Sequence, residues 1–200
     1  MGSALETTVL VTSEPDPLER ALVQALARGD AQARGDLYDR LAPAVARTAV
    51  ALGLRRREEV EDAVQETFLR LFTGLDRFDP ERPLRPYALG IARRVALEQA
   101  RKRRPLPPVP DEVPSGDTPA PDRAERAERR ALVVEALATL GDEQRSALAL
   151  RHSHRLTMQE LADALSCSVP TARARLREAA RRFAVQLRER GVLEAEGGAA

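Results

Sequence analysis

Three arginines, Arg173, Arg177 and Arg181, recur at every fourth position near the end of the chain, with Arg175 between them. On a helix this spacing places the three on one face. A guanidinium can donate two hydrogen bonds to the edge of a guanine, whereas other arginines contact phosphates without reading sequence. The spacing therefore points to DNA recognition in the major groove.

The residues just before this arginine stripe predict the element that would present it. Thr157 and Glu160 have the spacing of a capping box, which starts a helix. Ser166, Cys167 and Ser168 then form a short turn, and Ser168 can cap a second helix that carries the arginines. Two helices joined in this way are typical of a helix-turn-helix. The predicted DNA contacts of this element are Ser168, Thr171, Arg173, Arg175, Arg177 and Arg181.

A second basic segment spans residues 93–104 and carries a net charge of +5, as do residues 168–190, although the whole chain has only +1. Two basic segments in a nearly neutral protein indicate polyanion binding at two places, and solvated helix faces are the alternative. Two aromatic rings precede the first segment, and such rings either stack on unpaired bases or belong to the core. The second predicted DNA-binding set is Phe78, Tyr87, Arg93, Arg94, Arg101, Lys102, Arg103 and Arg104.

The stretch DAVQETFLRLF, residues 62–72, predicts a helix with two different faces. One stripe is apolar and indicates core packing. The other stripe is polar, and is either a solvated face or a surface for a partner. The apolar stripe contains Val64, Phe68 and Leu71, and the polar stripe contains Asp62, Gln65 and Glu66.

Composition narrows the fold and the classes of function. Hydrophobic residues make up 43% of the chain and aromatic residues 3%, and their spacing of three and four predicts an all-α protein. The chain has one cysteine and two histidines, which argues against a disulfide framework, a metal site or histidine-based catalysis. Both histidines, His152 and His154, are expected on a polar connector. We expect no cofactor and no catalytic residues. No apolar run reaches the length of a membrane span and the N-terminus has no signal-peptide pattern, so a cytoplasmic protein is expected.

Proline divides the chain into two helical domains. Residues 105–121 hold seven of the fourteen prolines and predict a flexible, extended linker. A four-helix domain is expected over residues 16–104, with helices at about 16–29, 36–52, 57–73 and 84–104. A second helical domain is expected over residues 122–190, beginning at a cap on Asp122. Residues 1–15 and 191–200 are expected to be disordered tails.

Three stretches in this order resemble a known family. DAVQETFLRLF, PLRPYALGIARRVALEQARKRR and ALATLGDEQRSALALRHSHRLTMQELADALSCSVPTARARLREAARRF are together similar to RNA polymerase sigma factors of the sigma-70 family. The compact two-domain layout resembles the extracytoplasmic-function group. The resemblance implies a sigma region 2-like four-helix domain followed by a sigma region 4-like helix-turn-helix domain.

The resemblance also implies roles and partners. Asp62, Gln65 and Glu66 match the surface that docks on the β′ coiled coil of core RNA polymerase, whose β subunit is a further contact. Residues 75–104 match the part that opens the −10 element and holds an unstacked base, and residues 168–183 match the −35 reading helix. Promoter DNA and a cognate anti-sigma factor are the other implied partners, without membrane insertion. Arg94 departs from the family, which often has Asn there.

Two other classes of function remain open from the sequence. A stand-alone helix-turn-helix regulator would bind DNA specifically without polymerase, and it would have no use for the polar stripe at Asp62. A helical enzyme would need a nucleophile–base pair or a phosphate-binding glycine loop, and neither pattern occurs in the sequence. We therefore interpret the chain as a specificity subunit of a polymerase rather than an enzyme.

Overall fold

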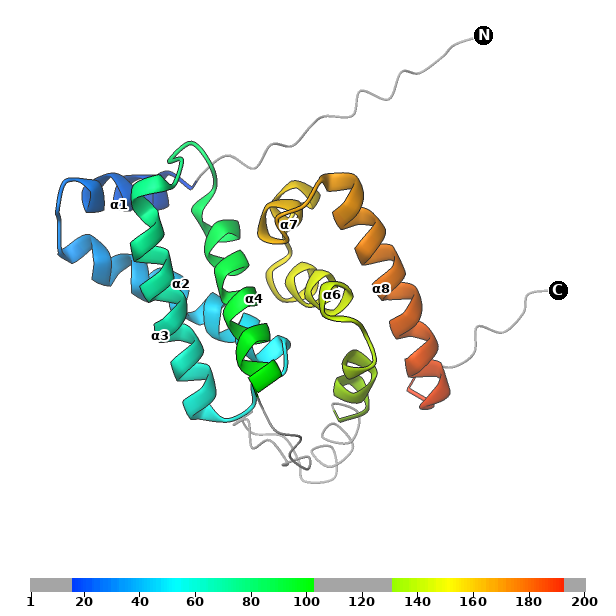
Figure 1. Ribbon diagram of the computed structural model, residues 1–200. Helices are drawn as coiled ribbons and strands as arrows, with labels where there is room; N and C mark the ends of the chain where they lie inside the picture. The colour runs from blue at the N-terminus through cyan, green and yellow to red at the C-terminus, as the bar shows by residue number, and fades with distance from the viewer. Residues whose placement is uncertain (1–15, 103–130, 193–200) are drawn as a thin grey trace, which may run out of the picture.

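The computed structural model describes residues 16–102 and 131–192, and every element in these ranges is helical (Figure 1). The predicted linker 105–121, the Asp122 cap, Arg103, Arg104 and the tail residues 1–15 and 193–200 lie outside the described residues. We call residues 16–102 the N-terminal half and residues 131–192 the C-terminal half.

The N-terminal half contains four α-helices. They are α1 (Pro17–Ala27), α2 (Gln32–Ala51), α3 (Arg57–Gly74) and α4 (Leu84–Lys102), with a 3-10 turn, η1 (Leu75–Arg77), after α3. These ranges confirm the four predicted helices, although α2 begins four residues earlier than expected. Helix α4 therefore carries most of the first basic segment, and α3 carries the polar stripe.

Local signals set the ends of these helices. The Asp16 carboxylate accepts a hydrogen bond from the Leu18 N–H at 2.9 Å, as an N-cap should. Helices α1 and α2 stop at Gly29 and Gly53, whose φ angles of 84° and 103° are left-handed. Glycine adopts this conformation without steric cost, so the chain can turn sharply after each helix.

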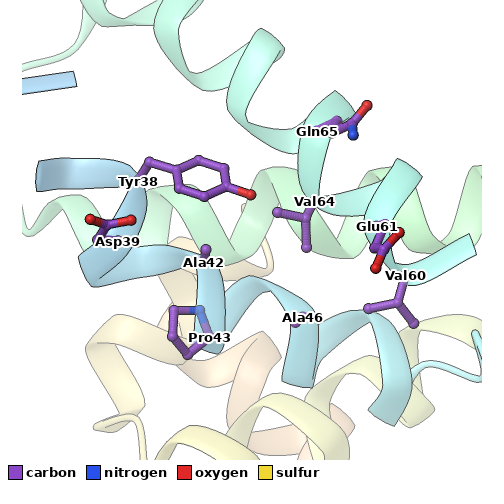
Figure 2. A pocket seen from close by; sticks show the side chains of 9 residues that line it. All are labelled: Tyr38, Asp39, Ala42, Pro43, Ala46, Val60, Glu61, Val64 and Gln65. Carbon is purple, nitrogen blue, oxygen red and sulfur yellow. The ribbon is translucent and has the colours of Figure 1, made fainter. Parts of the chain in front are cut away.

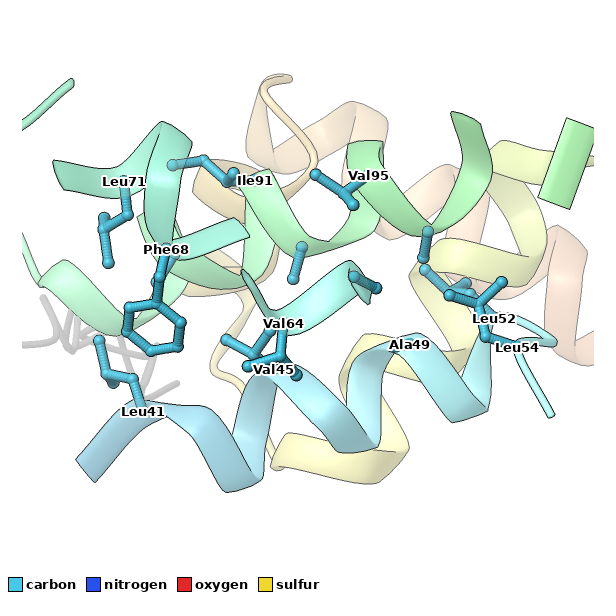
Figure 3. Close-up of a cluster of buried hydrophobic side chains, with 14 of the residues drawn as sticks. Leu41, Val45, Ala49, Leu52, Leu54, Val64, Phe68, Leu71, Ile91 and Val95 are labelled. Atoms are coloured by element: carbon cyan, nitrogen blue, oxygen red, sulfur yellow. The ribbon is translucent and has the colours of Figure 1, made fainter. Parts of the chain in front are cut away.

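The core of the N-terminal half forms where α2, α3 and α4 face one another (Figure 3). The apolar stripe predicted on α3 lies in this core, because Val64, Phe68 and Leu71 are at most 7% exposed. Leu41 and Val45 of α2 approach it from one side, and residues of α4 such as Ile91 and Val95 complete the cluster. Burial of one stripe of α3 leaves its opposite, polar stripe facing solvent.

The C-terminal half consists of a helical stretch at residues 131–138 followed by α6 (Asp142–His154), α7 (Met158–Ala164) and α8 (Val169–Glu189). Helices α7 and α8 are the two helices of the predicted helix-turn-helix. Gly191 and Val192 close α8 through hydrogen bonds to its last turn, so the structure places these two residues with the domain rather than the tail.

The two halves pack directly against each other, which the sequence did not predict. Helix α4 lies along α7, and α2 lies along α6 (Figure 1). Gly90 of α4 meets the backbone of α7 so closely that a Cβ at Gly90 would lie 2.9 Å from the Ala164 carbonyl oxygen. Ala44 and Leu89 of the N-terminal half join the core of the C-terminal half, beside residues such as Leu161.

His154 is the clearest correction to the sequence interpretation, which placed it on a polar connector. Its side chain is 5% exposed, and its Nε2 lies 2.8 Å from the Thr48 hydroxyl in α2. Thr48 donates its own proton to the Ala44 carbonyl at 3.0 Å, so Nε2 must donate to Thr48. The buried Nδ1 has no hydrogen-bond partner, and burial lowers the pKa of the imidazole to about 4, so His154 is neutral at neutral pH. His152 is exposed but lies in the last turn of α6, so neither histidine lies on a connector.

Candidate nucleic-acid and partner interface

The turn of the helix-turn-helix is held by hydrogen bonds at both ends. The Thr157 and Glu160 capping box starts α7, with the Thr157 N–H donating to Glu160 at 2.7 Å. After α7, Ser166 adopts a left-handed φ of 52°. Ser168 then caps α8 by accepting the Thr171 N–H at 3.3 Å, and the two hydroxyls lie 2.8 Å apart. Both hydroxyls are exposed at the start of α8, where backbone N–H groups favour a phosphate.

The arginines of α8 differ in their availability. Arg173 and Arg177 are exposed, and no ion pair occupies either of them within residues 16–102 and 131–192. Arg175 instead contacts Glu143 of α6 at 2.6 Å. Arg181 contacts Glu178 at 2.9 Å, and Arg181 together with Arg182 lowers the pKa of the Glu178 carboxyl to about 2. Arg173 and Arg177 are thus the two guanidinium groups of this stripe best placed to meet DNA.

Phe78 and Tyr87 lie together between η1 and the start of α4. Their ring centroids are 4.9 Å apart, and both rings are half-buried against the core. Gly74 lies beneath this pair, since a Cβ at Gly74 would lie 2.8 Å from the Tyr87 hydroxyl. The arrangement combines the two possibilities left open by the sequence, because each ring packs on the core and keeps part of its surface exposed.

The basic residues of α4 are divided between solvent and the C-terminal half. Arg94 and Lys102 are exposed. Arg93 is only 7% exposed and forms an ion pair with Glu143. Arg101 is exposed but contacts Asp142 at 2.7 Å, while Arg103 and Arg104 lie outside the described residues. Arg93 and Arg101 are therefore bound within the molecule rather than presented to a nucleic acid.

Helix α1 positions the turn and the start of α4. The Glu19 carboxylate is 4% exposed and accepts the Arg85 N–H at 3.2 Å, which caps α4. Burial, followed by the negative charge of Asp16, raises the pKa of Glu19. Arg20 reaches the turn before α4 and contacts Glu81 at 3.0 Å. No local sequence pattern predicts these contacts, since each joins residues more than 60 positions apart.

The polar stripe of α3 forms a ridge between two hollows. Asp62 and Gln65 are exposed and Glu66 is half-exposed. On one side, α2 and α3 enclose a groove of about 550 Å³, into which Tyr38 projects (Figure 2). On the other side, a hollow of about 650 Å³ lies between α3 and α4, with Leu69 on its wall. Gln65 lines both hollows, so the predicted partner surface is a shaped ridge rather than a flat face.

Arg70 ties this ridge to α4. It contacts Glu66 at 2.6 Å and Glu98 at 2.8 Å, and this pairing lowers the pKa of the Glu98 carboxyl. One of the predicted acidic residues, Glu66, is therefore already paired, whereas Asp62 is not held by an ion pair within the described residues.

Two exposed side chains with large apolar surfaces lie near the ridge, Leu69 on α3 and Tyr38 across the groove on α2, and the sequence interpretation missed both. Leu69 is 64% exposed and Tyr38 is 39% exposed. The signal for Leu69 was present, because it falls off the apolar stripe of DAVQETFLRLF and onto the polar side. Leu69 therefore adds an exposed apolar side chain to the polar side of α3.

Two other kinds of site are not found in the described ranges. No helix there has the length and apolar content needed to cross a bilayer. No group of three or more histidine, cysteine or acidic side chains there could hold a metal ion.

Two family models match the chain in succession. The model for Sigma-70 region 2 matches residues 37–105, and the model for Sigma-70, region 4 matches residues 136–183. The first match contains α3, α4 and most of α2. The second contains the helix-turn-helix and the arginine stripe of α8.

Similar proteins and structures agree with these models. The ECF RNA polymerase sigma factor SigL of Mycobacterium tuberculosis is 30% identical over 175 residues, which are 86% of this chain and 98% of SigL. The solved structure of CnrH in complex with the cytosolic domain of CnrY has a TM-score of 0.67 and 26% identity, covering 86% of this chain and 98% of CnrH. The sigma factor RpoE of Bartonella quintana, solved with the anti-sigma factor NepR, shares the fold with a TM-score of 0.55 and 21% identity, over 74% of this chain and 92% of RpoE. The chain belongs to the extracytoplasmic-function group of the sigma-70 family of RNA polymerase sigma factors.

Proposed function

We propose that this chain is a promoter-specificity subunit of RNA polymerase, which binds the core enzyme, directs it to particular promoters and helps to open the −10 element. The observation that carries this proposal is the match of the region 2 and region 4 models, in that order, to the two helical halves of one chain. In this function the chain contributes binding surfaces, and the polymerase contributes the catalytic site.

The ridge on α3 is the proposed docking surface for core polymerase. Asp62 and Gln65 supply exposed polar contacts, and Leu69 supplies an apolar contact beside them. A buried apolar centre with a polar rim is the usual anatomy of a protein interface. The hollows on either side of the ridge would admit side chains of the partner, which for this family is the β′ coiled coil.

Helix α8 is the proposed −35 reader. Its first turn presents Ser168 and Thr171 to the DNA backbone, and Arg173 and Arg177 follow on the exposed face. Phosphate contacts at the helix start would set the register, and the arginines would then reach guanine edges. Each bidentate contact of this kind discriminates between bases by about 1–3 kcal/mol.

The Phe78 and Tyr87 pair is the proposed platform for an unstacked base of the −10 element. Removing a base from the stack costs a few kcal/mol, and stacking on an aromatic ring recovers about 1–3 kcal/mol. Glu19 and Arg20 hold the surrounding turn in place, so the platform is formed before DNA arrives. Arg94 is exposed on α4 and would contact the same strand.

A cognate anti-sigma factor is a further proposed partner. Its support is membership of the extracytoplasmic-function group and the RpoE structure, which contains the anti-sigma factor NepR. The docking ridge is the surface that an inhibitor would need to cover in order to exclude the polymerase.

Reversal of one charge on the ridge tests this function. Asp62→Arg should reduce affinity for core polymerase at least tenfold, because Asp62 is exposed and not neutralised by an ion pair in the described residues. Promoter-dependent transcription in vitro with purified core enzyme should fall in parallel. Affinity is measured with labelled chain and core polymerase, and circular dichroism checks that the helical content is kept.

Asp36→Arg is the matched control, since Asp36 is an exposed aspartate of α2 that lines neither hollow. Equal losses in both variants would reject the ridge as the docking surface. Specific binding to promoter duplexes by the chain alone, with no stimulation of transcription by core polymerase, would instead identify a stand-alone regulator.

A further inference from the structure

Gly74 is the last residue of α3, and its backbone conformation does not require glycine. Its φ of −90° and ψ of −11° are right-handed helical, a conformation that residues with a Cβ adopt without strain. Glycine is also less favourable than alanine within a helix, because it loses more conformational freedom on folding. The reason for a glycine at this position therefore lies in its surroundings.

The Tyr87 side chain reaches Gly74 from the first turn of α4. A Cβ at Gly74 would lie 2.8 Å from the Tyr87 hydroxyl oxygen and 3.9 Å from the ring carbon that carries it. Real Cβ atoms essentially never make contacts shorter than 3.0 Å. Apart from the backbone of α3 and the adjacent residues, Tyr87 alone among the described residues comes within 4 Å of this Cβ. The missing side chain therefore makes room for the end of Tyr87.

Tyr87 cannot withdraw from Gly74 without changing the aromatic pair. The ring is rigid, so its hydroxyl moves only when the whole ring turns about its side-chain torsions. The ring lies 4.9 Å from the Phe78 ring at an angle of 34°, and it packs on the core. Its backbone is held by the first turn of α4, which Glu19 caps. A methyl group at Gly74 would therefore tilt the Tyr87 ring and leave the helices in place.

We propose that Gly74 is a positioning residue for opening of the −10 element, which seats the Tyr87 hydroxyl and thereby fixes the angle at which the ring receives an unstacked base. This inference rests on the proposed function, because it takes Phe78 and Tyr87 as the platform for that base. Favourable stacking of two rings requires a defined relative orientation, so a tilted ring binds the base more weakly. Gly74 acts through Tyr87 and needs no contact with DNA.

The seat is tested in the free chain by NMR of its tyrosine rings. The chain has two tyrosines, so isotope-labelled tyrosine gives signals from Tyr38 and Tyr87, and Tyr87→Phe assigns them. Gly74→Ala should shift the Tyr87 signals, because the ring is displaced from its seat. Gly35→Ala is the matched control and should leave the Tyr87 signals unchanged. Gly35 is an exposed glycine inside α2, and its Cβ would meet only the Gln32 side chain, at 3.9 Å.

The role in opening is tested with core polymerase and a promoter that the wild-type chain activates. Gly74→Ala should slow open-complex formation about tenfold, as expected when base stacking is weakened, and should keep the wild-type affinity for core polymerase. Permanganate reactivity of thymines in the −10 element measures the rate. In a Tyr87→Phe background the same substitution should slow opening by less than about twofold relative to Tyr87→Phe alone, because the oxygen that the methyl group meets is gone. Gly35→Ala should keep the wild-type rate.

Unchanged Tyr87 signals in Gly74→Ala would reject the seat. Equal losses of opening in the two backgrounds, or a matching loss of affinity for core polymerase, would make Gly74 a structural residue of α3 and overturn its positioning role. A wild-type chain that activates no promoter with core polymerase would reject the proposed function, and with it the role of Gly74 in opening. The tyrosine signals would still decide whether the seat itself exists.

Discussion

At the scale of the residue, His154 links the packing of the two halves to pH. Its burial, followed by the positive charges of Arg85 and Arg47, lowers the pKa of the imidazole from 6.5 to about 4. The unfolded chain therefore binds a proton more readily than the folded chain between these values. The free energy of unfolding should be highest above pH 6.5, decrease as the pH falls, and be lower by about 2 kcal/mol at pH 5 from this group.

Urea unfolding at a series of pH values measures this decrease. His154→Gln should flatten the profile, because glutamine can still donate to Thr48 and does not titrate. His152→Gln should keep the wild-type profile, since His152 is exposed two positions away. The assignment fails if His154→Gln retains the wild-type slope between pH 6.5 and 4.

At the scale of the element, α8 offers a test of how the chain reads the −35 sequence. Arg173→Ala should weaken use of the best promoters about tenfold and relax the preference at one base pair, because a bidentate contact with guanine is lost. Arg173→Lys keeps the charge but not the fork of donors, so it should lose the same preference with a smaller loss of affinity. Transcription from a promoter library with randomised −35 positions measures both effects. Unchanged base preferences in both variants would make Arg173 a phosphate contact only.

Helix ends were predictable because their signals are local. Asp16, Thr157 and Ser168 each cap the helix that begins within a few residues, so short sequence patterns contain the information. Ser166 is a partial exception. It adopts a left-handed φ of 52°, which glycine adopts freely but which costs a residue with a Cβ about 1 kcal/mol or more. The hydrogen bonds around it hold that conformation.

The candidate site was predictable only in part, because several of its contacts join distant segments. Sequence patterns identified Arg93 and Arg175 as basic residues on helices, but their common partner Glu143 lies 50 and 32 positions away. Thr48 and His154 are 106 positions apart. The hydrophobic periodicity of one helix does not predict which of its polar faces a second domain will cover. The polar interface between the halves was therefore missed.

At the scale of the whole molecule, the shared core should make the two halves unfold together. Leu89 of α4 is 1% exposed and packs with residues of the C-terminal half. Leu89→Ala should lower the free energy of unfolding by about 2–5 kcal/mol. Differential scanning calorimetry should show one transition in the wild-type chain, with calorimetric and van't Hoff enthalpies in agreement, and Leu89→Ala should shift it as a unit.

Leu41→Ala is the comparison, because Leu41 packs against α3 in the core of the N-terminal half and is not part of the cluster that contains Leu89. If the two halves unfold together, Leu41→Ala should shift the same single transition. Two resolved transitions, of which Leu41→Ala moves only one, would show that the halves unfold independently.

The burial of Ala44 and Leu89 by the C-terminal half also has a consequence during synthesis on the ribosome. Leu89 is made 72 residues before Leu161, one of the side chains that cover it. At a synthesis rate of about 5–20 residues per second, Leu89 stays exposed for roughly 4–14 s until Leu161 has been made. The chain is therefore most prone to aggregation after its N-terminal half has been made and before its C-terminal half follows. Binding of a chaperone would protect the chain most during this interval.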